Sequence, residues 1–76
     1  MTPEDRQRAV LAWLVAQPED SAHSVTRMCL LLRMSGADVR AALDVLVARG
    51  DAYRYRENGA EVYCASMKAI REARKT

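Results

Sequence analysis

The sequence contains few of the residues that build catalytic, metal or disulfide sites. Its 76 residues include two cysteines, one histidine and three glycines. Cys29 and Cys64 form no CxxC pair and His23 is not spaced with them as in a metal site. The sequence also lacks a glycine-rich phosphate loop and a paired-acid motif. We therefore expect no enzyme activity, no metal, no cofactor and two reduced thiols, with a disulfide or a redox switch as the less favoured alternative.

Long hydrophobic runs are also missing. Apolar runs such as Met28 to Leu32 are far too short to span a bilayer. The chain opens with MTPEDRQR, which is charged where a signal peptide would be apolar. Half of the residues are hydrophobic and 29% are charged, a balance that can bury a small core. We expect one domain over residues 1–76, located in the cytoplasm and without a membrane partner.

The positive charge lies towards the C-terminal end. The formal net charge is +2, with six basic and seven acidic residues up to residue 51 and six basic and three acidic residues after it. This asymmetry suits a partner that carries phosphates, although a solvated positive tail is the commoner meaning of so small an excess.

Cap residues and prolines predict two helices in the first half of the chain. Thr2 followed by Pro3 is typical of a helix start, and Pro18 prevents that helix from continuing. Ser24 can cap a second helix that runs to about Arg33.

The second half begins with a tight corner, RMSGAD, and a third helix over 36–49. Ser35 is its predicted N-cap, Asp38 can reach back as in a capping box, and Gly50 ends it. Residues 66–76 are expected to form a short basic C-terminal helix or tail, which Ser66 could cap.

A β-hairpin is predicted over 52–65. The segments AYRYR and AEVYCA alternate as strands do, and they flank Asn58 and Gly59, which tolerate the positive φ of a two-residue turn. Tyr53, Tyr55 and Tyr63 could stack on bases, but aromatic residues in a hairpin more often cover a core, and we favour the core.

The order of these elements resembles a winged helix-turn-helix domain of the kind found in small bacterial transcriptional regulators. The resemblance covers nearly the whole chain and implies a mainly α fold with a small antiparallel β-sheet (α+β), built from a three-helix core, a β-hairpin wing and a short C-terminal helix. The residues that carry it are Met28, Cys29, Leu32, Met34, Ser35, Val39, Leu43, Leu46 and Gly50.

The resemblance implies a DNA-binding surface and double-stranded DNA as the partner. In this family, outward residues of the third helix enter the major groove, and the wing contacts the backbone or the minor groove. Lys68 and Arg71 extend the basic surface on the final segment. The complete predicted set is Ser35, Ala37, Arg40, Ala41, Asp44, Arg54, Arg56, Asn58, Gly59, Lys68 and Arg71.

Two features qualify the resemblance. Arg33 stands where the turn of this family often has glycine, so we expect the turn geometry to differ, because a left-handed conformation is uncommon for residues with a Cβ. A short strand usually precedes helix two, which would place His23 in a three-stranded sheet with the wing.

The candidate DNA-contacting side chains each have an alternative role. Arg40 is the only long base-reading side chain on the outward face of the third helix, and it could equally pair with Asp44 one turn later. Arg54 and Arg56 share one strand face and could grip phosphates, or pair with Glu61 across the hairpin.

Two functions follow from these patterns. The first is a DNA-binding homodimer that pairs through helix one or the terminal helix. The second is a protein-interaction module with little DNA binding, suggested by Leu30 and Leu31, because five consecutive apolar residues cannot all face inward from a helix. The predicted interface residues are Trp13, Leu30, Leu31 and Ile70.

Overall fold

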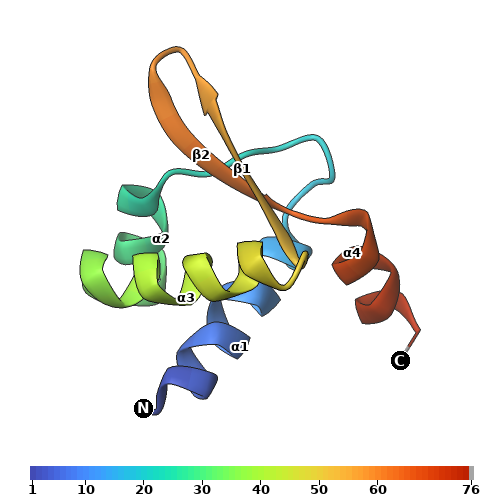
Figure 1. Cartoon of the computed structure of the whole chain (residues 1–76), viewed down its shortest axis with the longest axis horizontal. Coiled ribbons are helices and arrows are strands. Elements are labelled where there is room, and N and C mark those ends of the chain that lie inside the picture. The colour runs from blue at the N-terminus through green and yellow to red at the C-terminus, as the bar shows by residue number, and fades with distance from the viewer. Residues whose placement is uncertain (76) are drawn as a thin grey trace.

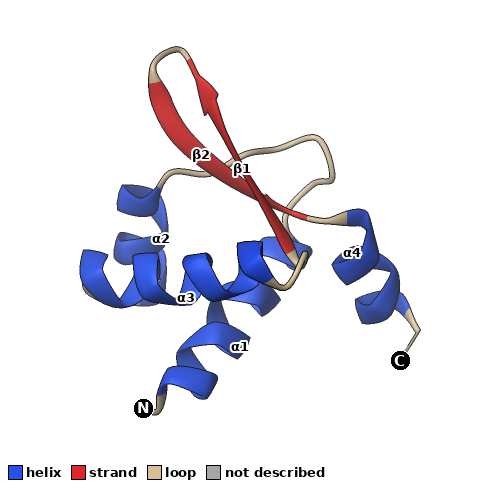
Figure 2. Ribbon diagram, viewed as in Figure 1, coloured by secondary structure: helices blue, strands red, loops and turns tan. Residues whose placement is uncertain are grey.

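The computed structural model describes residues 1–75, which form four helices and a two-stranded antiparallel hairpin that projects from them (Figures 1 and 2). The predicted α+β fold class is confirmed. Thr76, the last residue of the predicted 66–76 segment, lies outside the described residues. No helix within residues 1–75 has the length and apolar character needed to cross a membrane. The elements are α1 (Pro3–Ala16), α2 (Val25–Leu32), α3 (Gly36–Ala48), β1 (Ala52–Glu57), β2 (Ala60–Ala65) and α4 (Met67–Arg74).

The helices begin at the predicted caps. The Thr2 hydroxyl accepts a hydrogen bond from the Asp5 N–H at 3.1 Å, and the Asp5 carboxylate accepts one from the Thr2 N–H at 3.3 Å, which completes a capping box. The other three helices have a single serine cap, with a hydroxyl-to-N–H distance of 3.1 Å in each case. These caps are Ser24, Ser35 and Ser66.

The expected capping box at the start of α3 is only half formed. Ser35 accepts from the Asp38 N–H, but the Asp38 carboxylate does not return to Ser35. It pairs instead with the Arg6 guanidinium at 3.6 Å, so the acid ties α3 to α1. For the Asp38 carboxylate, Arg6 on another helix has replaced the expected partner within α3, the backbone N–H of Ser35.

Arg33 ends α2 in the left-handed conformation, with φ 55° and ψ 47°. The expectation that this residue would change the turn geometry is therefore wrong. The Arg33 N–H and the Met34 N–H both donate to the Cys29 carbonyl, the second at 3.2 Å. These bonds satisfy the end of the helix and hold the chain in a conformation that its Cβ disfavours.

Replacing Arg33 with glycine should stabilise the fold. Arg33→Gly removes the steric cost of the left-handed conformation, and part of this gain is offset by the greater freedom of glycine in the unfolded chain, so we expect a net gain of about 0.5–1 kcal/mol. Urea denaturation measures it. Arg33→Ala is the matched control, because alanine keeps the Cβ and should leave the free energy of unfolding nearly unchanged. Equal stability of the two variants would contradict the prediction.

The hairpin forms in the predicted register. Glu57 pairs with Ala60, and the turn between them has φ 53° at Asn58 and φ 80° at Gly59, as a type I′ turn requires. The expected third strand is reduced to one bridge, in which His23 and Tyr63 exchange backbone hydrogen bonds of 2.9 and 2.8 Å.

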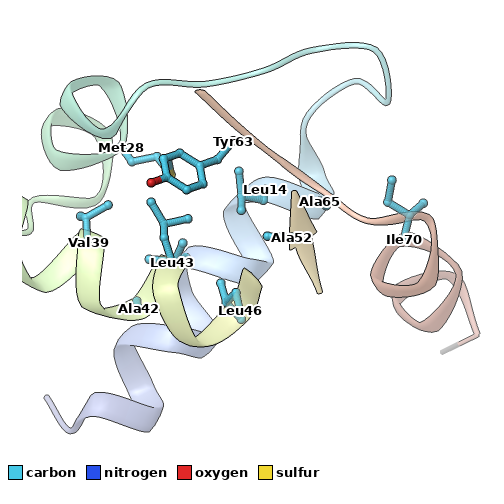
Figure 3. Close-up of a cluster of buried hydrophobic side chains, with 11 residues drawn as sticks. Leu14, Met28, Val39, Ala42, Leu43, Leu46, Ala52, Tyr63, Ala65 and Ile70 are labelled. Atoms are coloured by element: carbon cyan, nitrogen blue, oxygen red, sulfur yellow. The ribbon is translucent and has the colours of Figure 1, made fainter. Parts of the chain in front are cut away.

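Tyr63 lies at the centre of the core, where its ring packs among side chains from α1, α2 and α3 (Figure 3). Its side chain is 1% exposed. Ile70, an expected interface residue, is 6% exposed and belongs to the same cluster. Its side chain packs α4 against the core and is not available for a surface contact. The buried cluster consists of Val10, Leu14, Met28, Val39, Ala42, Leu43, Leu46, Ala52, Tyr63, Ala65 and Ile70.

Candidate nucleic-acid interface

Helix α3 presents one face to the core and the opposite face to solvent. Val39, Leu43 and Leu46 are completely buried, because their spacing places them on a single stripe against α1 and α2. The opposite face is exposed, and the hairpin rises beside it (Figure 1). The exposed residues on this outer face include the four predicted groove-facing ones, Ala37, Arg40, Ala41 and Asp44, and also Ala48 near the end of the helix. Ser35 is also exposed at the start of the helix.

Arg40 makes no ion pair with any residue in 1–75. The alternative of an Arg40–Asp44 bridge along the helix is wrong, because the Asp44 carboxylate pairs with Arg54 on β1. The Arg40 guanidinium therefore stands alone on the outer face of α3.

Arg54 is engaged within the molecule. Its Nη2 pairs with Asp44, its Nε donates to the Tyr63 hydroxyl at 3.0 Å, and Glu61 lies 3.7 Å from the same Nε. The guanidinium carbon is 5.3 Å from the centroid of the Tyr63 ring. The hydrogen bond to Tyr63, followed by the one to Asp44, raises the pKa of Arg54 further above its usual range. The alternative that Arg54 pairs across the hairpin with Glu61 is confirmed.

The Tyr63 hydroxyl links these groups to the core. It accepts from Arg54 and donates to the Glu61 carboxylate at 2.7 Å. Burial, together with the bond to Glu61, raises the pKa of Tyr63, so the hydroxyl keeps its proton and its donor role.

Arg56 is the other guanidinium of the hairpin, and it has no carboxylate partner in the described part of the chain. Its Nη1 donates to the Gly59 carbonyl at 3.2 Å. Because side chains two residues apart on a strand share a face, Arg56 lies on the same side of β1 as Arg54, one step nearer the tip. Asn58 and Gly59 form the exposed tip.

The tyrosines of the hairpin divide between the two faces of the sheet. Tyr63 is in the core, as favoured, but Tyr53 and Tyr55 are exposed on the other face, and the expectation that they cover the core is wrong for these two. The helices pack on only one side of the hairpin, and that side is already filled by the ring of Tyr63.

Lys68 is held at the junction of α3, β1 and α4. Its ammonium lies 3.3 Å from the carboxylate of Asp51 and donates to the Arg49 carbonyl at 3.2 Å, and the Arg49 guanidinium lies 2.6 Å from the same carboxylate. Burial opposes ionisation of Asp51, but the bonds from Arg49 and Lys68 keep its pKa below the usual range. Lys68 therefore has a structural partner, whereas Arg71 is exposed and without an ion pair in residues 1–75.

The three remaining interface candidates lie apart from the α3 outer face. Trp13 is partly buried, and its ring meets His23 edge to face at 4.7 Å. Leu30 and Leu31 project from α2 and are 75% and 56% exposed. A largely apolar groove of about 350 Å³ runs between α1 and α4, with its floor formed by Leu11, Ala12, Val15 and Ala69.

The arrangement of these elements matches solved structures. A structure of ZitR from Lactococcus lactis, a double mutant in apo form, superposes with a TM-score of 0.80 over 96% of this chain at 21% sequence identity. The chain has a winged helix fold. Two further ZitR structures, of the double mutant and of a single mutant, give TM-scores of 0.81 and 0.76, identities of 22% and 20%, and coverage of 99% and 92% of this chain.

The winged helix spans about half of each ZitR chain, with 55%, 49% and 47% of those chains covered. No family model matches the sequence, and no curated protein shows significant similarity to it. In this winged helix, α3 is the third helix and the β1–β2 hairpin forms the wing.

Proposed function

We propose that this winged helix is the DNA-binding domain of a transcriptional regulator. Helix α3 enters the major groove, and the wing lies on the backbone or in the minor groove. The likeness to ZitR, a transcription regulator, supports this choice among the uses of the fold.

The observation that carries the proposal is Arg40, which lies on the exposed face of α3 and has no ion pair within residues 1–75. An α-helix fits the major groove, and arginine can donate two hydrogen bonds to the O6 and N7 atoms of guanine. Ala37 and Ala41 beside it are small, so the helix backbone can approach the base edges closely. One arginine per helix gives modest sequence discrimination.

The wing supplies backbone contact through Arg56 and the turn at Asn58 and Gly59. The two-residue turn is exposed and its backbone is free of side-chain bulk at Gly59, which suits close approach to a phosphate row. Contacts of this kind contribute affinity and fix the orientation of the domain without reading sequence.

A homodimer would compensate for the sparse reading surface. Two copies related by a two-fold axis place two Arg40 side chains in successive major grooves, and the half-site spacing then contributes to specificity. We assign the contact between the two copies to the exposed part of α1, which includes the accessible part of the Trp13 side chain.

The exposed pair Leu30 and Leu31 favours one second function, a protein-interaction module. Two adjacent exposed leucines on a helix are more typical of a protein-binding surface than of the surface of a monomer. They lie on α2, outside the α3 outer face, so binding of a protein partner there would not need Arg40 or Arg56.

Titration of duplex DNA at two salt concentrations tests the DNA-binding proposal. We expect binding with two chains per duplex site, and the logarithm of the affinity should fall linearly with the logarithm of the salt concentration, by about 0.9 for each phosphate contacted. Fluorescence anisotropy measures both. Affinity that does not respond to salt, or no binding at 50 mM salt, would reject the proposal and favour the protein-interaction module.

A further inference from the structure

The ion pair between Asp44 and Arg54 joins the two parts of the DNA-binding surface. Asp44 lies on the outer face of α3, and Arg54 belongs to the wing. The Asp44 side chain is 66% exposed and that of Arg54 is 37% exposed, so the pair is open to solvent, and in the proposed binding mode it faces the DNA.

We propose that Asp44 occupies the position of a DNA phosphate on Arg54, and that a backbone phosphate displaces this carboxylate when the domain binds DNA. The inference rests on the proposed function and adds a phosphodiester site to it. Asp44 thereby limits the affinity of the free domain for DNA in general.

The geometry keeps Arg54 in position for such an exchange. Its Nε is bound to the hydroxyl of the buried Tyr63, and the guanidinium lies 5.3 Å from the ring centroid. These two contacts do not involve Asp44, so the guanidinium stays oriented when the carboxylate leaves. A guanidinium binds carboxylate and phosphate oxygens through the same planar arrangement of donors, and a phosphate can therefore replace Asp44 on Nη2.

The charges around Arg54 oppose DNA in the free domain. Asp44 and Glu61 place two carboxylates beside one guanidinium, and both would repel a phosphate. An exposed ion pair is weak in water, because both charges remain hydrated and the side chains lose freedom when they pair. Displacement of Asp44 is therefore feasible once Arg40 and Arg56 hold the duplex nearby.

Asp44→Asn tests the inference, because asparagine has nearly the same shape and no charge. We expect this variant to bind a duplex of arbitrary sequence roughly fivefold more tightly than the parent at low salt. Its salt slope should be steeper by about 0.9, because in the parent the displaced Asp44 carboxylate takes up a cation and so offsets the counterion release from one phosphate contact. Anisotropy titrations of both proteins at 50, 100 and 200 mM salt measure the difference.

Two control variants separate this effect from a general change in charge. Asp20→Asn removes one negative charge from the exposed loop between α1 and α2 and should leave the salt slope unchanged. In Arg54→Gln the guanidinium is lost, and adding Asp44→Asn to that variant should not steepen the salt slope. Circular dichroism confirms that each variant is folded.

Each other result overturns the inference in a recognisable way. If Asp44→Asn weakens binding to every duplex, the pair holds the wing in place and is not a substitute for phosphate. If it weakens binding to one sequence only, Asp44 reads a base. If the parent binds DNA and Asp44→Asn binds with the same slope, this inference alone fails. If neither the parent nor Asp44→Asn binds DNA in a salt-dependent way, both this inference and the proposed DNA-binding function fail.

Discussion

Arg40→Ala is expected to lower the affinity for the preferred duplex by about tenfold to a hundredfold, the cost of losing a two-bond contact to guanine. Arg40 has no ion pair within residues 1–75, so its removal breaks no bridge and should leave stability nearly unchanged. The loss should be largest for the preferred sequence and small for unrelated duplexes. Competition titrations against both kinds of duplex measure it.

Two further variants show which part of the surface is responsible. Arg27→Ala is the control for charge, because Arg27 is exposed on α2, away from the α3 outer face, and makes no ion pair within residues 1–75. Arg56→Ala removes a wing cation and should weaken binding to all duplexes alike, with a salt slope lower by about 0.9. If the combined Arg40→Ala and Arg56→Ala variant retains DNA as well as the parent does, α3 and the wing do not bind DNA, and the protein-interaction module becomes the better explanation.

Tyr63→Ala is expected to cost about 3–5 kcal/mol of folding free energy, as for other large aromatic side chains removed from a core. Tyr63 links several parts of the fold, because its ring fills the core, its backbone pairs with His23 and its hydroxyl joins Arg54 to Glu61. A domain of 76 residues has little stability in reserve, so a large part of the variant should be unfolded at 37 °C.

The matched control for the ring is Tyr63→Phe. It keeps the packing and removes only the hydroxyl, so we expect a loss of about 1 kcal/mol. Urea denaturation followed by circular dichroism gives both values. If alanine and phenylalanine destabilise the domain equally, the hydroxyl network and not the ring supports the fold, contrary to the packing argument.

The sequence predicted those features of the fold that depend on neighbouring residues. The serine caps, the end of α3 at Gly50 and the type I′ turn at Asn58 and Gly59 are all as expected. Each is fixed by hydrogen bonds or φ preferences within about four residues, so a short segment contains the needed information. The exposure of Leu30 and Leu31 was equally accessible, because it follows from 3.6 residues per turn.

The candidate DNA-binding surface was predicted only in outline. The sequence located the exposed face of α3 and the wing, but it could not assign partners to their charges. Arg54 and Lys68, both expected on DNA, bind Asp44 and Asp51. No sequence signal distinguished Arg54 from Arg56, because the two side chains are two residues apart and therefore lie on the same face of the strand.

What the sequence by itself determined is where the helices begin and where the hairpin turns. Only the tertiary structure decided which carboxylate meets which guanidinium, that Tyr63 and not Tyr53 or Tyr55 fills the core, and that Ile70 is buried. The physical reason is one of range. Caps and turns are closed by atoms a few bonds apart, whereas an ion pair or a core position requires two elements to be packed at a set distance and angle, and that is fixed only when the whole core assembles.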